Sequence, residues 1–353
     1  MKKLILIALI AIMIAGCGLK PPAKGSLDEV IVFADSAVYA ACGPALSLAL
    51  ERRIDTPQPE TVFTLKPVPW SEFGNSSSAP LILLMGRLNG EGEVSVYVKG
   101  MFDEETRKGV EAGQYWLFIK ENPWHSHQLA AVICADDIGE LKSRIRLGAD
   151  EIFTEINEPV MARLHDMLYS AKEQIKLEEE LFDKYGFKIR IQHDYLLVRD
   201  ELEERFVRLR RFNPDRWLTI SWVEADTLTD SLIAAERIRL GKLFTDPTAI
   251  YPDYNRFQPY DYIYTGGRML RGLWAAESNI GGGPFFTCAL HSHSDGMVYF
   301  IDGSVFSPGK DKLPFLQQLE VMARTFQPPE NRKPRTENRE PKTENREPKT
   351  ENR

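Results

Sequence analysis

The chain has 353 residues, of which 43% are hydrophobic, and a formal net charge of −7. Such a length accommodates one large or two medium domains with buried cores. The acidic balance argues against nucleic acid as a partner, because phosphates would be repelled and no basic patch interleaved with aromatic residues offsets this. Cys42, Cys134 and Cys288 stand in apolar surroundings, which predicts buried side chains; one disulfide among them is the alternative.

The chain opens with a segment, 1–16, that has the layout of a secretory signal peptide. Two lysines precede the unbroken apolar run 4–14, which is shorter than the roughly 20 residues that a membrane-spanning helix needs. The run leads into Ile-Ala-Gly-Cys, which resembles the lipobox of bacterial lipoproteins. This resemblance implies cleavage before Cys17, a diacylglycerol thioether on its sulfur and usually an acylated amino terminus, such as a palmitate.

Lipidation of Cys17 predicts a protein of the cell envelope that is anchored to a membrane. An ordinary signal peptide with a chance cysteine is the alternative. Gly18 stands where an aspartate is associated with inner-membrane retention in some lineages, so the outer membrane is favoured if the organism has one. Residues 17–28 are polar and contain Pro21, Pro22 and two glycines, which predicts a flexible tether between anchor and body.

The N-terminal part of the body, 29–185, alternates between apolar strand patterns and helical patterns. We expect strands over 29–34, 81–85, 115–120 and 129–135, and helices over 35–53, 103–113, 137–158 and 160–185. Pro44 and Pro159 are expected to interrupt the helices around them, because proline lacks the backbone N–H. This alternation predicts a subdomain of helices and strands.

The pattern changes from residue 186 to 327, where short aromatic or β-branched runs dominate. Strands are expected over 188–192, 195–200, 205–212, 217–223, 262–266, 271–278, 284–293 and 297–306, and helices over 229–244 and 314–326. The five arginines within 205–216 are mixed with apolar residues, which indicates a half-buried strand with a charged face. The chain therefore predicts an α+β fold of mixed and antiparallel sheets with flanking helices, in two subdomains. The strand order loosely resembles the sandwiches of PsbP and Mog1, which is a fold analogy and implies no function.

The C-terminal tail, 328–353, repeats the heptad Glu-Asn-Arg-Glu-Pro-Lys-Thr with small variations. It has no apolar residue from Glu330 onward, so nothing would offset the entropy cost of ordering it. We predict a disordered tail, which serves as a spacer or binds a partner.

The most evident candidate for chemistry is His291-Ser-His293-Ser-Asp295. In a continuous strand these three side chains would face one side and could form an open metal site. However, Asp295-Gly296 is a strong signal for a two-residue hairpin turn, which would place His293 opposite Val298 and His291 opposite Phe300. A solvated hairpin tip is favoured, and a metal-dependent hydrolase using His291 and His293 is the alternative. We expect no cofactor.

The chain contains none of the common catalytic signatures, such as a nucleophile elbow, a zinc-protease helix or a phosphate-binding loop. The run Gly281-Gly282-Gly283 precedes a strand and is explained by close approach of the backbone. A ligand pocket, if present, is expected where aromatic residues and glycines converge. Its candidate residues are Trp217, Trp222, Trp274, Gly282 and Phe285.

Several pieces of the C-terminal part resemble a family of envelope lipoproteins that share the domain of unknown function DUF4837. They are Arg-Gly-Leu-Trp at 271–274, Gly-Gly-Pro-Phe at 282–285, Val-Phe-Ser-Pro at 305–308 and the closing helix up to Phe326. In the N-terminal part, Asn122-Pro123-Trp124 with Gln128 and the apolar strand after it resembles the family more weakly. The family implies no activity or ligand. We therefore predict a non-enzymatic module that binds an envelope protein or a small ligand. An assembly factor recognised through its acidic surface is a further alternative, and the oligomeric state stays open.

Overall fold

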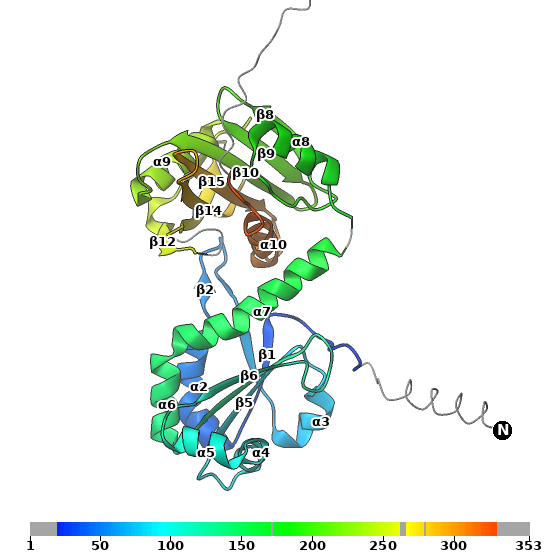
Figure 1. Cartoon of the computed structure of the whole chain (residues 1–353), viewed down its shortest axis with the longest axis vertical. Coiled ribbons are helices and arrows are strands. Elements are labelled where there is room, and N and C mark those ends of the chain that lie inside the picture. Colours follow the sequence, from blue (N-terminus) through cyan, green and yellow to red (C-terminus); the bar gives the residue numbers. More distant parts are fainter. Residues whose placement is uncertain (1–19, 171, 262–265, 279, 330–353) are drawn as a thin grey trace, which may run out of the picture.

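The computed structural model describes residues 20–170, 172–261, 266–278 and 280–329. The predicted signal peptide, Cys17 and nearly all of the predicted tail lie outside these residues. Figure 1 shows two bodies of mixed helix and strand, one above the other, with the long helix α7 (Ala149–Tyr169) running obliquely between them. No helix in the described part of the chain combines the length and the apolar character needed to cross a bilayer.

The described residues of the N-terminal body are built on a five-stranded sheet in the order β4-β1-β5-β7-β6. Its strands are β1 (Glu29–Ala34), β4 (Thr64–Pro67), β5 (Leu81–Arg87), β6 (Leu117–Glu121) and β7 (Leu129–Ala135). The first four strands in this order are parallel, and β6 joins the edge antiparallel. Every residue of β7 is buried, as expected for a parallel strand with helices over both faces.

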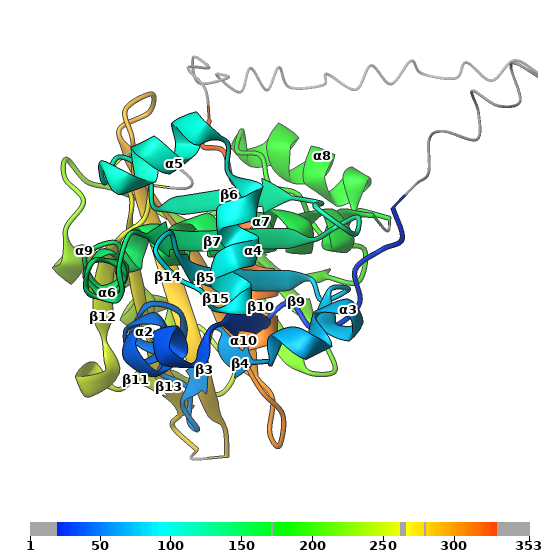
Figure 2. The same cartoon turned by 90° about the horizontal axis from the view of Figure 1, so that it is seen from below.

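Helices cover both faces of this sheet. On one face, α2 (Ser36–Leu50), α6 (Ile138–Leu147) and α7 share an apolar core with the strands. On the other face lies α4 (Glu93–Met101), which crosses in front of the sheet in Figure 2. The connections add β2 (Arg53–Ile54), β3 (Glu60–Thr61), η1 (Trp70–Glu72), α3 (Phe73–Ser76) and α5 (Glu104–Glu111).

The two prolines expected to interrupt helices instead lie inside them. α2 continues through Pro44 and α7 continues through Pro159, whereas the break between α6 and α7 falls at Gly148. A proline inside a helix removes one backbone hydrogen bond. In α2 the side chains of Cys42 and Leu46, on either side of Pro44, are fully buried against the sheet, and this packing outweighs the lost bond.

The segment before β1 also differs from the flexible tether predicted over 17–28. From Lys20 onward it lies against the N-terminal body. The Ala23 backbone N–H donates to the Ser126 carbonyl at 2.9 Å, and the Lys24 N–H donates to the Ser78 carbonyl at 2.8 Å. These backbone bonds do not depend on side-chain type, so the polar composition of the segment gave no indication of them.

The described residues of the C-terminal body form an eight-stranded sheet whose main path is β11-β13-β14-β15-β10-β9-β8, with β12 also paired to β13. All these pairings are antiparallel. The strands are β8 (Leu196–Glu201), β9 (Phe206–Arg211), β10 (Asp215–Glu224), β11 (Thr248–Ile250), β12 (Arg256–Pro259), β13 (Arg268–Ala276), β14 (Gly282–Ser292) and β15 (Met297–Phe306). This arrangement confirms the predicted fold of mixed and antiparallel sheets with flanking helices.

The two faces of the C-terminal sheet carry different helices. α9 (Asp230–Lys242) packs on one face through Ile233, and α8 (Ile175–Tyr185) and α10 (Leu313–Ala323) pack on the other. A short 3-10 helix, η2 (Pro252–Tyr254), precedes β12. The strand expected over 188–192 is absent from the described sheets, and its residues Lys188 and Gln192 form only isolated bridges.

The three described cysteines, Cys42, Cys134 and Cys288, are buried and free, as the preferred reading of the sequence predicts. Burial raises the pKa of the Cys134 thiol to about 12, with Asp136 adding to the effect. Burial likewise raises the pKa of Cys288 well above its usual value. These thiols therefore stay protonated and act as small apolar side chains.

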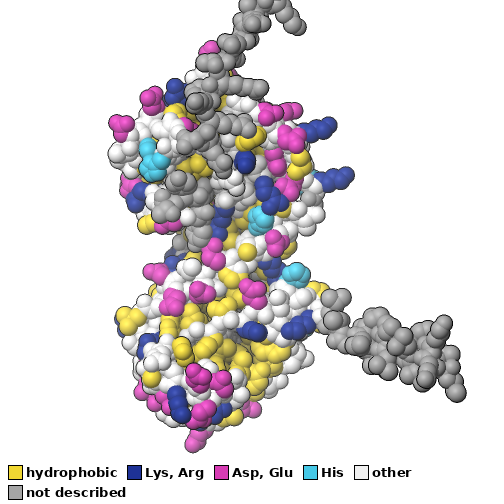
Figure 3. Space-filling view, in the orientation of Figure 1, with side chains coloured by type: hydrophobic (Ala, Val, Ile, Leu, Met, Phe, Trp, Pro, Cys, Tyr) yellow, Lys and Arg dark blue, Asp and Glu magenta, His cyan; other side chains and the backbone are white. Residues whose placement is uncertain are grey.

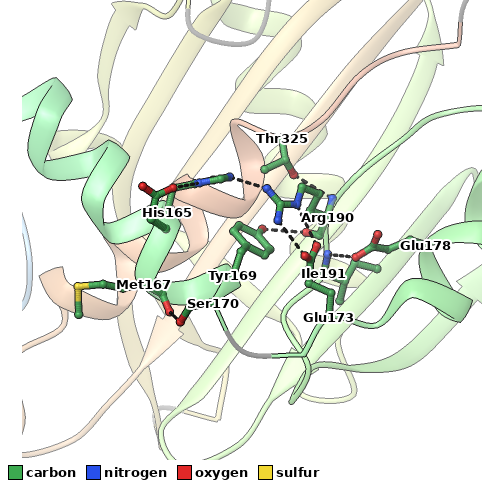
Figure 4. A network of polar contacts seen from close by, with 10 residues as sticks. His165, Met167, Tyr169, Ser170, Glu173, Glu178, Arg190, Ile191 and Thr325 are labelled. Atoms are coloured by element: carbon green, nitrogen blue, oxygen red, sulfur yellow. Dashed lines mark hydrogen bonds and ion pairs between the residues drawn. The ribbon is translucent and has the colours of Figure 1, made fainter. Parts of the chain in front are cut away.

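The chain passes from one body to the other between α7 and α8, earlier than the boundary predicted at residue 185. Figure 4 shows the contacts that hold this crossover. Arg190 donates to both carboxylate oxygens of Glu173 at 2.8 and 2.9 Å and to His165 Nε2 at 2.9 Å. Its guanidinium lies 4.0 Å from the centre of the Tyr169 ring. The end of α7 is thus fixed to the C-terminal body.

A second contact between the bodies lies at the start of α10. The carboxylate of Glu60, in β3, accepts hydrogen bonds from the backbone N–H groups of Lys312 and Leu313 at 2.8 to 3.0 Å. A negative charge is favourable at a helix N-terminus, where the first N–H groups lack partners within the helix. At the other end of α10, Arg324 pairs with Glu158 of α7 at 2.9 Å.

Candidate functional site

A cavity of about 400 Å³ lies on the α9 face of the C-terminal sheet, beside the C-terminal end of α9. Such a volume suits a small organic molecule. Four aromatic residues, Trp217, Phe244, Trp274 and Phe306, are part of its wall. Trp217 of β10 lies edge-on to Trp274 of β13, with ring centres 6.1 Å apart, and edge-on to Phe244 at 5.7 Å. Phe306 of β15 lies 6.4 Å from Trp274.

Beneath the cavity, strand register aligns a row of polar side chains across four neighbouring strands. Arg208 pairs with Thr219, Thr219 with Asp302, and Asp302 with Thr287. Arg208 Nε donates to Thr219 Oγ1 at 3.0 Å, and Thr287 Oγ1 donates to Asp302 Oδ2 at 2.7 Å. All four residues are buried. Buried polar groups of this kind are stable only when their hydrogen bonds are satisfied.

A second buried arginine reaches this row from α9. Arg237 Nε lies 3.0 Å from Asp302 Oδ2, and its guanidinium lies 4.5 Å from the centre of the Phe285 ring. Arg208 has no such carboxylate: its guanidinium donates to the carbonyls of Leu240 and Leu243, at the negative end of the α9 dipole. Burial lowers the pKa of Arg208 to about 10, although Asp302 opposes the shift.

The cavity therefore holds an uneven set of charges. Two buried arginines, Arg208 and Arg237, line it, and of these Arg237 pairs with a buried carboxylate, Asp302, whereas Arg208 is bonded to Thr219 and to two carbonyls. The arginines at the rim have carboxylates of their own: Arg199 pairs with Glu201 at 2.8 Å, and Arg210 with Asp215 at 2.9 Å. Asp246, also at the rim, is exposed and accepts hydrogen bonds from Ser278.

Apart from Arg237 Nε, which has its ion pair with Asp302, side chains that line the cavity carry buried polar atoms with no hydrogen-bond partner among the described residues. They are Arg237 Nη1, Trp274 Nε1 and Thr248 Oγ1. The exposed fractions of these residues are 1%, 6% and 7%. Two of the donors flank Gly241, where an added Cβ would lie 2.8 Å from Thr248 Oγ1 and 3.3 Å from Arg237 Nη1. These atoms are enclosed by the surrounding protein and have almost no accessible surface, so they do not face a molecule in the cavity. Leaving them unpaired costs stability.

The residues predicted to form one pocket lie in different parts of the C-terminal sheet. Trp217 and Trp274 line the cavity, and Phe285 lies under Arg237. Gly282 pairs with Ala275 at the beginning of β14. Trp222 lies on the opposite face of the sheet, where its ring is 4.9 Å from Tyr185. Side chains alternate along a strand, so the odd separation of Trp217 and Trp222 already implied opposite faces.

Sequence reasoning did not identify Arg208, Arg237 or Thr248 as site residues. The alternation of Arg208 and Arg210 with apolar residues was visible, but it was interpreted as a charged strand face. In the structure that face is covered by α9, so Arg208 is buried. The glycine run behaves as expected, since a Cβ on Gly283 would lie only 2.0 Å from the Val305 carbonyl.

The two histidines lie at a hairpin tip whose register differs from the predicted one. Ser292 pairs with Met297 and His291 with Val298, so the loop has four residues, 293–296, and His293 lies in it. The Asp295 carboxylate stabilises this longer loop by accepting from the Met297 N–H at 3.1 Å and the Tyr299 hydroxyl at 2.6 Å.

His291 and His293 nevertheless lie close together, with their Nδ1 atoms 3.2 Å apart. His291 Nε2 lies 3.1 Å from the Ala225 carbonyl and donates to it. Catalytic zinc sites use three protein ligands. The described residues contain no group of three or more His, Cys, Asp or Glu side chains placed to hold a metal ion. The metal site at the two histidines therefore stays a prediction.

Comparisons with known proteins agree with part of this picture. Residues 174–325 match the model of a family described as a domain of unknown function, DUF4837. This match confirms the resemblance of the C-terminal part and covers the segment that forms the cavity, but it does not extend to the weaker likeness around 122–128. No curated protein matches the chain.

Solved structures offer distant likenesses. A mutant of the protein Mog1 is 11% identical with a TM-score of 0.28, and the alignment covers 41% of this chain and 93% of that one. The Ran-binding protein Mog1p of Saccharomyces cerevisiae is 11% identical with a TM-score of 0.29 over the same shares. The cyanobacterial PsbP of Synechocystis is 14% identical with a TM-score of 0.29, covering 41% of this chain and 87% of that chain.

Proposed function

We propose that this chain is a lipid-anchored protein of the cell envelope that binds a small molecule in the cavity beside α9 without acting on it chemically. The observation that carries this proposal is a cavity of about 400 Å³ in which four aromatic side chains lie beside the buried arginines Arg208 and Arg237. Three of the four rings that line it, Trp217, Trp274 and Phe244, are themselves packed edge to face, so the cavity walls are held in place without a ligand.

The binding role is tested by native mass spectrometry of the full chain in detergent, compared with its denatured mass. An additional small-molecule mass that is lost on denaturation supports the proposal. A cavity-filling variant, Ala276→Phe, should abolish the additional mass, since Ala276 lines the cavity. Ala249→Phe is the matched control because Ala249 is exposed on the paired strand β11. Equal ligand content in the two variants would contradict the proposal.

The anchor rests on the lipobox-like sequence before Cys17, and two acyl chains or more suffice for stable membrane attachment. In a bacterial host, Cys17→Ala should move the protein from the membrane fraction to the soluble periplasmic fraction. Intact mass measurement should at the same time show loss of the lipid. A Cys17→Ala chain that stays in the membrane fraction would refute lipid anchoring. Cys42→Ala, at a buried and free cysteine, is the control.

Recognition through an acidic surface is the weaker alternative. Figure 3 shows acidic and basic side chains interspersed over both bodies on the face in view. A surface that binds by charge alone usually gathers one sign of charge. The cavity, by contrast, has walls that are defined by packed aromatic rings.

A further inference from the structure

We infer that the N-terminal body rests directly on the membrane surface, with the segment 20–24, the loop 122–127 and the end of β6 turned towards the phospholipid head groups. These three parts are called the tether face below. The inference rests on the anchoring part of the proposed function, because it assumes that Cys17 carries a lipid. It adds a partner for one defined surface of the protein, which a lipid at the end of a long flexible chain would not give.

The short length of chain between the anchor and the body carries the inference. Lys20, the first described residue, comes three residues after Cys17. Three fully extended residues span at most about 11 Å, and the head-group layer on each side of a bilayer is roughly 5–8 Å thick. A lipid on Cys17 therefore leaves Lys20 no more than a few ångströms beyond the head groups.

The segment that follows Lys20 is fixed to the body and cannot act as a longer tether. Besides the bonds of Ala23 and Lys24, the Ser126 N–H donates to the Pro21 carbonyl at 3.0 Å. Lys20 Nζ donates to the Pro123 carbonyl at 2.9 Å. Because the segment is bonded at several points to the loop 122–127, the body cannot move away from the anchor without breaking these bonds.

The loop 122–127 is itself held firmly by the buried side chain of Gln128. Gln128 Oε1 accepts hydrogen bonds from the backbone N–H groups of Trp124 and His125 at 3.2 and 3.1 Å. Its Nε2 donates to the carbonyls of Ser77 and Ala79, both at 2.7 Å. The loop therefore presents a fixed surface at the place where the anchor brings the membrane.

The side chains of the tether face suit the interface of a bilayer. Lys20 and Lys24 are exposed and outnumber the exposed Glu121 at the end of β6, and basic residues are attracted to anionic lipids. Trp124 is half-buried, and tryptophan is favoured at the depth of the head groups. Figure 3 shows hydrophobic side chains gathered on the N-terminal body where Figure 1 shows β6, an edge strand whose residues 117–119 are only partly buried.

The test compares two matched positions of the lipidated full chain, Glu121→Cys and Glu151→Cys. Both glutamates are exposed. Glu121 directly precedes the loop, whereas Glu151 lies in the first turn of α7. Arg163, which donates to the His127 carbonyl, comes twelve residues after Glu151, or about 18 Å further along the helix. Figures 1 and 2 show α6, which leads into α7, on the opposite side of the body from the segment before β1.

Each variant carries a nitroxide on its new cysteine, since Cys42, Cys134 and Cys288 are buried. The protein is purified with its lipid and reconstituted into vesicles of phosphatidylethanolamine and phosphatidylglycerol that contain a nickel-chelating lipid. Nickel at the head groups broadens the electron paramagnetic resonance spectrum of a nearby nitroxide. We expect the label at position 121 to lose most of its signal amplitude, and the label at position 151 to keep the amplitude that it has in vesicles without nickel.

A third chain tests whether the short link holds the body in place. Insertion of about ten Gly and Ser residues after Leu19 of Glu121→Cys adds a flexible spacer of roughly 17 Å root-mean-square length. The insertion leaves every described residue unchanged, so the fold should be unaffected. The signal amplitude at position 121 should recover in the presence of the nickel-chelating lipid.

The outcomes separate this inference from the proposed function. If the labels at positions 121 and 151 lose equal amplitude, or the label at 151 loses more, the tether face is not the surface that meets the membrane, and the inference is overturned while the anchor stands. If the spacer does not restore the signal at position 121, the short link does not hold the body, and the inference also fails. If the purified chain lacks the mass of a lipid and does not float with vesicles, the proposed anchoring fails, and the inference fails with it.

Discussion

Replacement of Glu320 by Gln is the substitution from which we expect the largest loss of stability. Glu320 lies in α10 and is almost fully buried between two arginines. Its Oε2 is 2.5 Å from Arg271 Nη2, and its Oε1 is 3.2 Å from Arg324 Nη2. The Tyr260 hydroxyl also donates to Oε1, at 3.3 Å. Burial alone would raise the pKa of Glu320, but Arg271 and Arg324 outweigh it and hold the pKa below its ordinary value of 4.5.

The size of the effect depends on which carboxylate partner each arginine retains after the substitution. In Glu320→Gln, Arg324 retains Glu158 at 2.9 Å, whereas Arg271, only 17% exposed, loses its described carboxylate partner. Leaving one charge buried without its partner costs about 3–5 kcal/mol. This is a large part of the about 5–15 kcal/mol that stabilises a typical domain. The double variant Arg271→Met/Glu320→Gln removes both charges, so it should be more stable than Glu320→Gln alone, with a coupling of at least about 1 kcal/mol.

Urea denaturation of the full chain, followed by tryptophan fluorescence, measures these differences, provided that the m-value is unchanged between variants. The folded pKa of Glu320 is lowered, so the contribution of its carboxylate is present above pH 4.5 and is lost as the pH falls through the folded pKa. The acid limb of the stability curve should therefore be flatter in Glu320→Gln. The reasoning would be refuted if the stability losses of the two single variants simply added in the double variant. It would also be refuted if the acid limb of the stability curve were the same in Glu320→Gln as in the parent protein.

Two further predictions concern the junction of the bodies. Burial raises the pKa of Glu178 above its ordinary 4.5, although the Ile191 N–H donates to it. The folded protein therefore loses stability as the pH rises from the pKa of Glu178 in the unfolded chain to its pKa in the folded chain. In parallel thermal melts, Glu178→Gln should be more stable than the parent protein at about pH 7 and equal to it below pH 4.5. A constant difference in melting temperature at all pH values would contradict the raised pKa of Glu178. Glu60→Ala removes the acceptor at the start of α10 and should cost about 0.5–2 kcal/mol, with faster amide exchange in Lys312 and Leu313. Lys66→Ala is its control, since the ion pair of Lys66 with Glu29 is exposed and should contribute little. Equal amide exchange of Lys312 and Leu313 in both variants would show that Glu60 does not cap α10.

The longer strands of the C-terminal sheet could be predicted from the sequence because they are aromatic or β-branched runs bounded by turn residues, whereas the short strands β11 and β12 were not predicted. The expected strand 297–306 coincides with β15, and the expected strand 29–34 coincides with β1. Helix interruptions were harder to predict, because Pro44 and Pro159 are local signals and the packing that overrides them is not local. α4 contains three valines, Val94, Val96 and Val98, which weakens its helical pattern, and it was not predicted.

The candidate site was harder to predict, for a different reason. Arg208, Arg237 and Thr248 lie on β9, α9 and β11, and only strand register and the placement of α9 bring them together. The aromatic part of the cavity was partly accessible, since Trp217 and Trp274 are conspicuous residues in the strand patterns. To predict the balance of buried charges, one must know which side of β9 is covered, and the composition of the sequence does not show this.

The contact of Glu60 with α10 joins the segment that matches the family model to a part of the chain outside it. The segment that matches the family model, 174–325, contains α10 but not the carboxylate at its start. Leu313, at the head of the same helix, belongs to the apolar core of the N-terminal body. A gene fragment encoding only the matched segment would therefore produce a helix with an uncapped end and an orphaned leucine. The segment that matches the family model is therefore smaller than the set of elements that pack together around α10.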